Sequence, residues 1–71
     1  MRDVKASVGK RVRRLRKKKE LSQEELADRC GIHRGHMGQI ERGEKNLTLS
    51  TLQKLGKGLK VSVSRLLKGI L

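Results

Sequence analysis

Residues 22–43 read SQEELADRCGIHRGHMGQIERG, in which two short amphipathic segments lie on either side of a glycine. Ser22 followed three residues later by Glu25 is the pattern of a capping box, which predicts that a helix begins directly after the serine. Gly31 suits the left-handed backbone conformation of the residue that ends such a helix. Apolar positions with helical spacing resume shortly after this glycine. Two helices joined by a short turn with glycine are typical of a helix-turn-helix, here over about residues 22–41.

Three further segments carry the spacing of amphipathic helices. Apolar residues recur every three or four positions near residues 4–15, 49–59 and 63–70, which is the period of one helical face. The inward positions of the middle segment are expected to be Leu49, Leu52, Leu55 and Leu59. Because the chain has no aromatic residue and no proline, a core of aliphatic side chains on helices is favoured. We therefore expect an all-α fold, a compact five-helix domain that comprises residues 1–71 as a single unit.

The charge of the chain indicates a polyanionic partner. Nineteen Lys and Arg residues against seven Asp and Glu residues give a formal net charge of +12. A basic surface that serves only solubility is the alternative, but so large a charge on so short a chain favours nucleic acid. We therefore expect double-stranded DNA or another nucleic acid as the partner.

The cysteine and hydropathy patterns indicate the compartment. Cys30 is the only cysteine, so an intramolecular disulfide is impossible and a reducing cytosol suits the chain. The sequence contains no stretch of about 18 apolar residues and no apolar run of a secretory signal. We expect a cytoplasmic protein without a membrane partner.

The sequence is similar to those of a known family. LSQEELADRCGIHRGHMGQIERGEKNLTLSTLQKLGKGLKVSVSRLL (residues 21–67) resembles the phage-repressor and Cro type of helix-turn-helix domain. The segment VGKRVRRLRKKKE (residues 8–20) also fits the first helix of that family. Within it, HRGHMGQIERGEKNLTL (residues 33–49) is most similar to the small controller proteins of restriction-modification systems. The resemblance implies a lambda-repressor-like fold in which the helix of about residues 23–30 crosses the DNA backbone and that of about residues 34–41 enters the major groove.

The helix of about residues 34–41 is the recognition helix of this arrangement. Three side chains on its outer side are candidates for base contacts. Arg34 can meet O6 and N7 of guanine with two hydrogen bonds, although a phosphate contact is a close alternative. Gln39 can pair with N6 and N7 of adenine, or else reach only water. His36 takes the place where the controller proteins commonly have a larger aromatic residue, and it suits a base edge or a phosphate.

Four other residues are candidates for contacts with the DNA backbone. Gln23 matches a glutamine of the family that holds a phosphate at the start of the second helix, where the helix N-terminus also favours an anion. Arg42, Lys45 and Asn46 belong to the loop after the recognition helix, which in the family lies along the backbone. The alternatives are an ordinary polar residue for Gln23, a solvated turn for the loop, and a cap of the next helix for Asn46.

The acid and the two imidazoles within this stretch have structural interpretations. In the family the residue at Glu41 pairs with an arginine of the first helix, and the matching position here is Arg16. His33 replaces the usual serine or threonine N-cap, which weakens the recognition helix by about 1 kcal/mol unless the imidazole itself acts as the cap. Cys30, His33 and His36 lie three residues apart, but zinc needs about four ligands and no fourth is nearby. We expect no metal and no cofactor.

Gly35 and Gly38 are unusual within a helix, where each costs about 1 kcal/mol relative to alanine. Both are expected on the side that faces DNA. Two interpretations remain open: the helix backbone approaches the groove closely there, or the protein reads fewer bases than its relatives do.

The last helix, at about residues 63–70, is rich in apolar residues for so small a chain. Its side chains are expected to be divided between the core and a dimer interface, and they are Val63, Leu66, Leu67, Ile70 and Leu71. A two-fold dimer presents two recognition helices about one turn of DNA apart, which suits a palindromic operator.

The function expected from these features is that of a sequence-specific DNA-binding transcriptional regulator, which acts as a homodimer through the major groove. The alternative is an antitoxin-like or other protein-interaction module whose DNA binding is secondary. An enzyme is not expected, because the sequence shows no nucleophile with a base, no paired carboxylates and no room for a substrate cavity. We likewise expect no small-molecule ligand.

Overall fold

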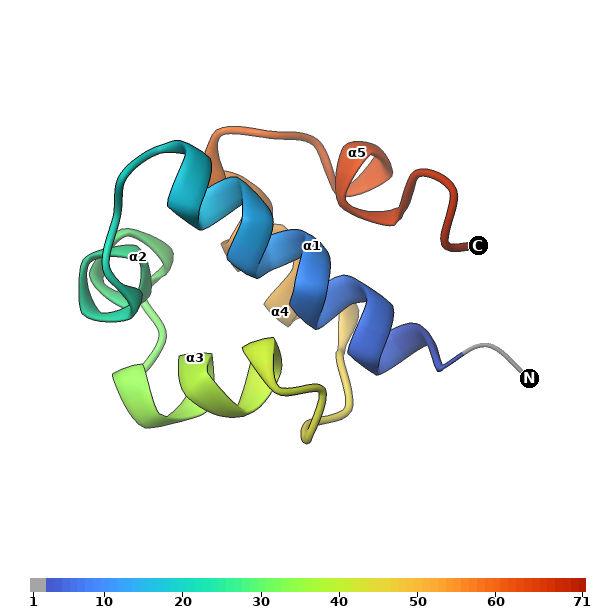
Figure 1. Ribbon diagram of the computed structural model, residues 1–71, viewed down its shortest axis with the longest axis horizontal. Helices are drawn as coiled ribbons and strands as arrows, with labels where there is room; N and C mark the ends of the chain where they lie inside the picture. The colour runs from blue at the N-terminus through green and yellow to red at the C-terminus, as the bar shows by residue number, and fades with distance from the viewer. Residues whose placement is uncertain (1–2) are drawn as a thin grey trace.

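The computed structural model describes residues 3–71, and within this range the chain forms five helices and no strand (Figure 1). The helices are α1 (Val4–Lys18), α2 (Gln23–Cys30), α3 (Arg34–Glu41), α4 (Leu49–Leu59) and α5 (Val63–Leu67). The all-α, five-helix fold that the sequence predicts is therefore confirmed. No helix in the described range combines the length and the apolar character needed to cross a membrane.

The last helix is shorter than predicted. α5 ends at Leu67 and does not continue to about residue 70. Lys68 leaves the helical conformation with a ψ of 124°, and Gly69 has a left-handed φ of 78°, which glycine adopts without steric cost. The turn that results brings Ile70 back against the core, where it is 7% exposed.

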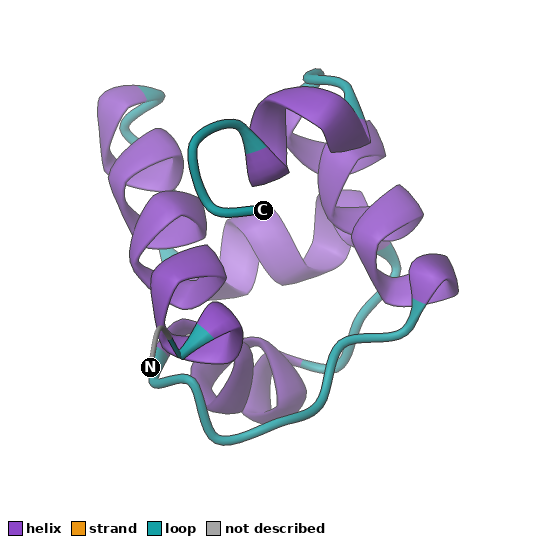
Figure 2. Cartoon of the chain, turned by 90° about the vertical axis from the view of Figure 1, so that its right-hand side faces the viewer, coloured by secondary structure: helices purple, strands orange, loops and turns teal. Residues whose placement is uncertain are grey.

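α1 lies between α3 and α5. In Figure 1, α5 lies above α1 and α3 lies below it, and Figure 2 again shows α5 near the top and α3 at the bottom of the molecule. α4 packs against α2 as well as against α1 and α5. The helix-turn-helix formed by α2 and α3 therefore has α1 and α4 behind it.

The core is aliphatic throughout, as the composition requires. Every one of the helices contributes at least one fully buried side chain, which lowers the free energy of folding by removing apolar surface from water. The largest of these side chains are Leu26, Met37, Ile40, Leu55, Leu59, Leu66, Val8 and Val12.

One leucine of α4 departs from the predicted inward face. Leu55 and Leu59 are fully buried and Leu52 packs partly against the core, but Leu49 is 65% exposed. A helix advances by about 100° per residue, so Leu49 is turned by about 80° from Leu59 and by about 120° from Leu55. The prediction that Leu49 points inward was therefore wrong, because a spacing of three residues drifts around the helix.

Two glycines allow pairs of helices to cross at close range. A Cβ atom on Gly9 of α1 would lie only 2.7 Å from the carbonyl oxygen of Glu41, and it would also collide with the carbonyl oxygen of Ile40 in α3. In the same way, a Cβ atom on Gly58 of α4 would collide with Sγ of Cys30 in α2. These contacts explain why both helices tolerate a residue that weakens an isolated helix.

Replacing Gly9 by alanine is expected to lower the free energy of unfolding by about 1–3 kcal/mol, because the added methyl group meets backbone that cannot rotate away. Urea denaturation followed by circular dichroism measures this change. Lys10→Ala on the exposed side of the same helix is the matched control and should remain near the wild type. An equal loss in both variants would show that the crossing is not the cause.

Candidate nucleic-acid interface

The helix-turn-helix begins with a complete capping box. Ser22 Oγ accepts a hydrogen bond from the amide of Glu25 at 3.0 Å, and the Glu25 carboxylate accepts one from the amide of Ser22 at 2.8 Å. The hydrogen bond from the Ser22 backbone holds the pKa of Glu25 below its usual value. Gly31 then ends α2 with a φ of 68°, and the amide of Ile32 donates to the carbonyl of Ala27 at 2.9 Å. The turn between the two helices is fixed by these bonds.

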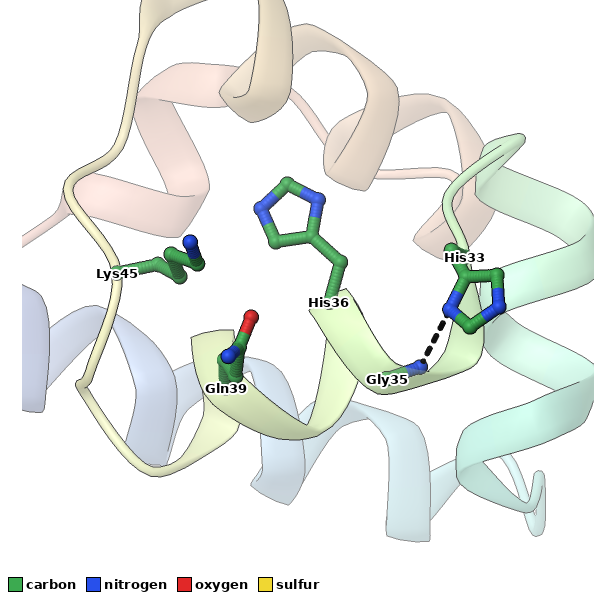
Figure 3. Close-up of a pocket in the computed structure, with 5 residues that line it drawn as sticks. All are labelled: His33, Gly35, His36, Gln39 and Lys45. Carbon is green, nitrogen blue, oxygen red and sulfur yellow. Dashed lines mark hydrogen bonds between the residues drawn. The ribbon is translucent and has the colours of Figure 1, made fainter.

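α3 begins with an imidazole cap. His33 Nδ1 accepts a hydrogen bond from the amide of Gly35 at 3.0 Å, as Figure 3 shows. The imidazole thereby supplies the acceptor that a serine or threonine hydroxyl ordinarily supplies at this position. Met37 and Ile40 are buried on the opposite side of the helix, which sets the rotation of α3 and decides which of its side chains face outward.

A buried ion pair connects α3 to α1. Arg16 Nε lies 2.7 Å from Glu41 Oε2, and Arg16 Nη2 donates to Glu41 Oε1 at 3.0 Å, so the contact is bidentate. The arginine also donates to the carbonyl of Leu21 at 2.8 Å, and Gln23 Nε2 donates to Glu41 Oε1 at 3.1 Å. The two ionised side chains are 11% and 2% exposed. Hydrogen bonds thus compensate both buried charges and join α1, the start of α2 and the end of α3.

The outward side of α3 is flanked by two shallow hollows. One is lined by His36 and Gln39 of α3 and by Lys45 of the following loop, together with His33 and Gly35. Figure 3 shows the side chains of His36, Gln39 and Lys45 on the same side of the helix. The other hollow brings Arg34 next to Gln23 of α2 and to Arg42, together with Ser22, Glu24, Gly35 and Gly38. The three base-contact candidates are therefore divided between the two flanks of α3.

Both arginines of the second hollow are paired with acids. Arg34 Nη1 lies 3.3 Å from Glu24 Oε2. Arg42 makes two contacts with Glu44, at 2.9 and 3.2 Å. The hydrogen bond between Arg42 and Glu44 raises the pKa of the arginine and lowers the pKa of the glutamate. All four side chains are more than half exposed, and exposed pairs of this kind are weak enough for a phosphate or a base to replace the acid.

The two unusual glycines of α3 have different surroundings. Gly35 is exposed, but Gly38 is buried beneath Arg42 and Gln23. A Cβ atom on Gly38 would lie 3.1 Å from Arg42 Nη1 and 3.6 Å from Gln23 Oε1. Gly38 therefore gives the Arg42 side chain room to lie across the helix, whereas Gly35 leaves the helix backbone uncovered.

The helix-turn-helix family model matches residues 12–66, which is most of the chain. The chain belongs to the helix-turn-helix family of DNA-binding transcription regulators. Control protein C.SmaI of Serratia marcescens is 48% identical over 65 residues, which cover 92% of this chain and 77% of the relative. Control protein C.BamHI of Bacillus amyloliquefaciens is 38% identical over 66 residues, 92% of this chain and 82% of the relative.

Solved structures lead to the same family. The restriction-modification controller protein C.AhdI from Aeromonas hydrophila superimposes with a TM-score of 0.83 and 39% sequence identity, over 86% of this regulator and 92% of that chain. The resemblance to the restriction-modification controllers is thereby confirmed. The family consists of transcription regulators that are not enzymes.

The loop after α3 presents Lys45 and Asn46 to solvent. Both residues are exposed. Asn46 does not cap α4 of the regulator, because that position belongs to Thr48, whose Oγ1 accepts from the amide of Thr51 at 3.1 Å. The alternative role considered for Asn46 is therefore taken by the threonine, and the asparagine side chain remains accessible.

The apolar residues at the C-terminal end are split between the core and the surface. Leu66 is 0% exposed and Ile70 is 7% exposed, so both are buried within a single chain of the regulator. Val63 and Leu67 are half-buried, and Leu71 is 82% exposed. Val63, Leu67 and Leu71 are therefore accessible to a second chain. Leu66 and Ile70 are not.

Two ion pairs of this interface were not predicted from the sequence. Glu24 and Arg34 are ten residues apart in the sequence, and only the angle of the helix-turn-helix brings their side chains together. The pairing of Arg42 with Glu44 has a weak signal, because opposite charges two residues apart in a loop can meet. Neither pair follows from helical periodicity.

Replacing Glu41 by alanine is expected to lower the free energy of unfolding by about 3–5 kcal/mol, since it leaves the Arg16 charge buried and unpaired. The double variant Arg16→Met/Glu41→Leu should recover most of this loss, because no charge is then left without its partner. Chemical denaturation of the three proteins measures both effects. A double variant that is less stable than Glu41→Ala would contradict this account of the pair.

Proposed function

We propose that this transcription regulator binds a palindromic operator as a homodimer, with α3 of each chain in the major groove. The observation that carries the proposal is the fixed outward side of α3. Its apolar side is buried, its end is held by the Arg16–Glu41 pair, and its outer flanks carry polar side chains that suit base edges and phosphates. In this proposal the described helices act as one domain.

Base reading is assigned to both flanks of α3. Arg34 lies at the first position of the helix, where its guanidinium can reach O6 and N7 of guanine once Glu24 is released. Gln39 and His36 on the other flank can contact adenine or a further base edge. Since the exposed Gly35 lies between the flanks and has no side chain, the backbone of α3 can come close to the base pairs there.

Backbone contacts are assigned to residues around the two ends of the helix-turn-helix. Gln23 is the first residue of α2, where unpaired amides and the helix dipole favour a phosphate. Its side-chain amide already donates one hydrogen bond to Glu41, which leaves the second hydrogen for DNA. Arg42, Lys45 and Asn46 extend along the other end and add positive charge and hydrogen-bond donors.

The dimer interface is assigned to Val63, Leu67 and Leu71. These are the accessible members of the apolar set at the C-terminal end, and a self-complementary contact would remove them from water. A two-fold axis through this contact would space the two α3 helices for half-sites about one turn of DNA apart.

Selection of bound duplexes from a random pool tests the proposal directly. The expected product is a palindrome bound by two chains, and sedimentation of the free protein should show a dimer that Leu67→Asp converts to a monomer. A selected sequence without two-fold symmetry, or a wild-type monomer at micromolar concentration, would contradict the proposed dimer. The mutation Leu67→Asp requires a circular dichroism spectrum like that of the wild type as a control.

The roles of Arg34 and Lys45 are separable by measurement. Arg34→Ala should reduce the preference for the selected duplex over a random duplex by about tenfold, because a bidentate contact to guanine supplies about 1–3 kcal/mol of discrimination. Lys45→Ala should weaken both complexes alike and reduce the salt slope by about 1. Fluorescence anisotropy titrations at several salt concentrations provide these values. An unchanged preference in Arg34→Ala would show that Arg34 reads no base.

The pairing of Arg42 with Glu44 is expected to limit binding to DNA without an operator. Glu44→Gln removes the acid that competes with phosphate for the guanidinium, so affinity for a random duplex should rise by roughly twofold to fivefold. Asp28→Asn on α2 is the matched control, since it removes the same charge from an exposed acid with no ion pair among the described residues. An equal rise in both variants would assign the effect to net charge alone.

A further inference from the structure

The positive charge of this regulator is concentrated away from its helix-turn-helix. Residues 20–44, which contain α2 and α3, carry six acids and only three bases. By contrast, residues 4–19 carry nine bases and no acid, and residues 45–71 carry six bases and no acid. The net charge that attracts a polyanion therefore belongs mainly to α1, α4 and α5.

Part of this charge gathers in a groove between α1 and α5. The α1–α5 groove is lined by Arg11, Arg14, Ser62, Ser64, Arg65 and Lys68. Gly69 completes the lining, so none of the described residues there is an acid or has an apolar side chain. In the described part of the chain, Arg14, Arg65 and Lys68 make no ion pair, so their charges are available to a ligand.

The base of the groove is held in place by Arg11. Its Nη1 atom donates to the carbonyl of Arg65 at 2.9 Å, and its Nη2 atom donates to the carbonyl of Lys68 at 2.8 Å. These bonds satisfy carbonyls at the end of α5 and fix that helix against α1. The cations of the two elements are therefore presented at a constant separation.

The groove lies on the other side of α1 from the recognition helix. Gly9 and Arg16 of α1 contact α3, whereas Arg11 contacts α5, and Figure 1 shows α3 and α5 on opposite sides of α1. A straight duplex held against α3 cannot also enter the groove. Any polyanion in the groove must be a second molecule or a distant segment of the same one.

We propose that the α1–α5 groove binds the phosphate backbone of a second DNA duplex, without sequence preference. Cations and serine hydroxyls are the groups that contact phosphates in protein–DNA interfaces. A site for an acidic protein would be expected to contain an apolar or aromatic anchor, and lysine is depleted in the centre of such interfaces. The regulator would thus bridge two duplexes, one on α3 and one on the opposite side of α1.

A capture assay tests this proposal without knowledge of the operator. A random 30-base-pair duplex on beads is saturated with the full chain and washed, and a fluorescent random duplex is then added. The groove variant Arg14→Gln/Arg65→Gln/Lys68→Gln leaves Arg11 intact, so that α5 keeps its position. The control Lys54→Gln/Lys57→Gln/Lys60→Gln removes the same charge from exposed residues of α4 and its C-cap.

The wild type and the control should capture the second duplex, whereas the groove variant should load onto the beads but capture none. For three lost phosphate contacts the salt slope of capture is expected to fall by about 3. Capture by the groove variant at the wild-type level, or equal loss in the control, would overturn the proposal. A glutamate-rich peptide and unlabelled DNA are then compared as competitors, with both concentrations counted in anionic groups. Displacement of the second duplex by less peptide than DNA would also overturn the proposal, since an acidic protein would then be the better ligand. Failure of operator selection affects the proposed function only.

Discussion

The buried pair of Arg16 and Glu41 is the interaction on which the DNA-binding surface depends. α3 has eight residues, two of them glycines, and a helix so short and so poor in helix-forming residues is unstable in isolation. The pair fixes its C-terminal end to α1, and Gln23 extends the contact to the first residue of α2. One shared carboxylate therefore joins α1, α2 and α3, and it adds to the turn at Gly31 in holding α3 relative to α2.

Most of the positive charge of this regulator lies outside the helix that is proposed to read bases. The helix-turn-helix segment is net negative, while the rest of the chain supplies the large positive charge. Arg34 is paired with Glu24, and Arg42 is paired with Glu44, so in the proposed complex contacts with DNA would replace these pairs. In the proposed complex, long-range attraction would come mainly from the helices that are not assigned to base reading. The segment that contains α3 is itself net negative.

Much of the fold followed from local chemistry. Ser22 begins α2 as the capping-box pattern predicts, and Gly31 forms the turn. The two errors concerned position around a helix and the end of a helix: Leu49 is exposed, and α5 ends at Leu67. For the candidate site, the resemblance implied the pair of Arg16 with Glu41, which the structure contains. The sequence predicted neither the division of Arg34 from His36 and Gln39 nor the pairing of Arg34 and Arg42 with acids.

The sequence by itself determined the five helices, the turn between α2 and α3, and the family of regulators, because caps, glycine and apolar spacing act within a few residues of one another. Only the tertiary structure decided how far apart the charged groups lie. The crossing of α1 and α3 at Gly9 places Arg16 against Glu41, and the bonds from Arg11 to α5 build a cationic groove opposite the recognition helix. Coulomb interactions and hydrogen bonds depend on distances in space, and spacing along the chain does not fix those distances for residues on different helices.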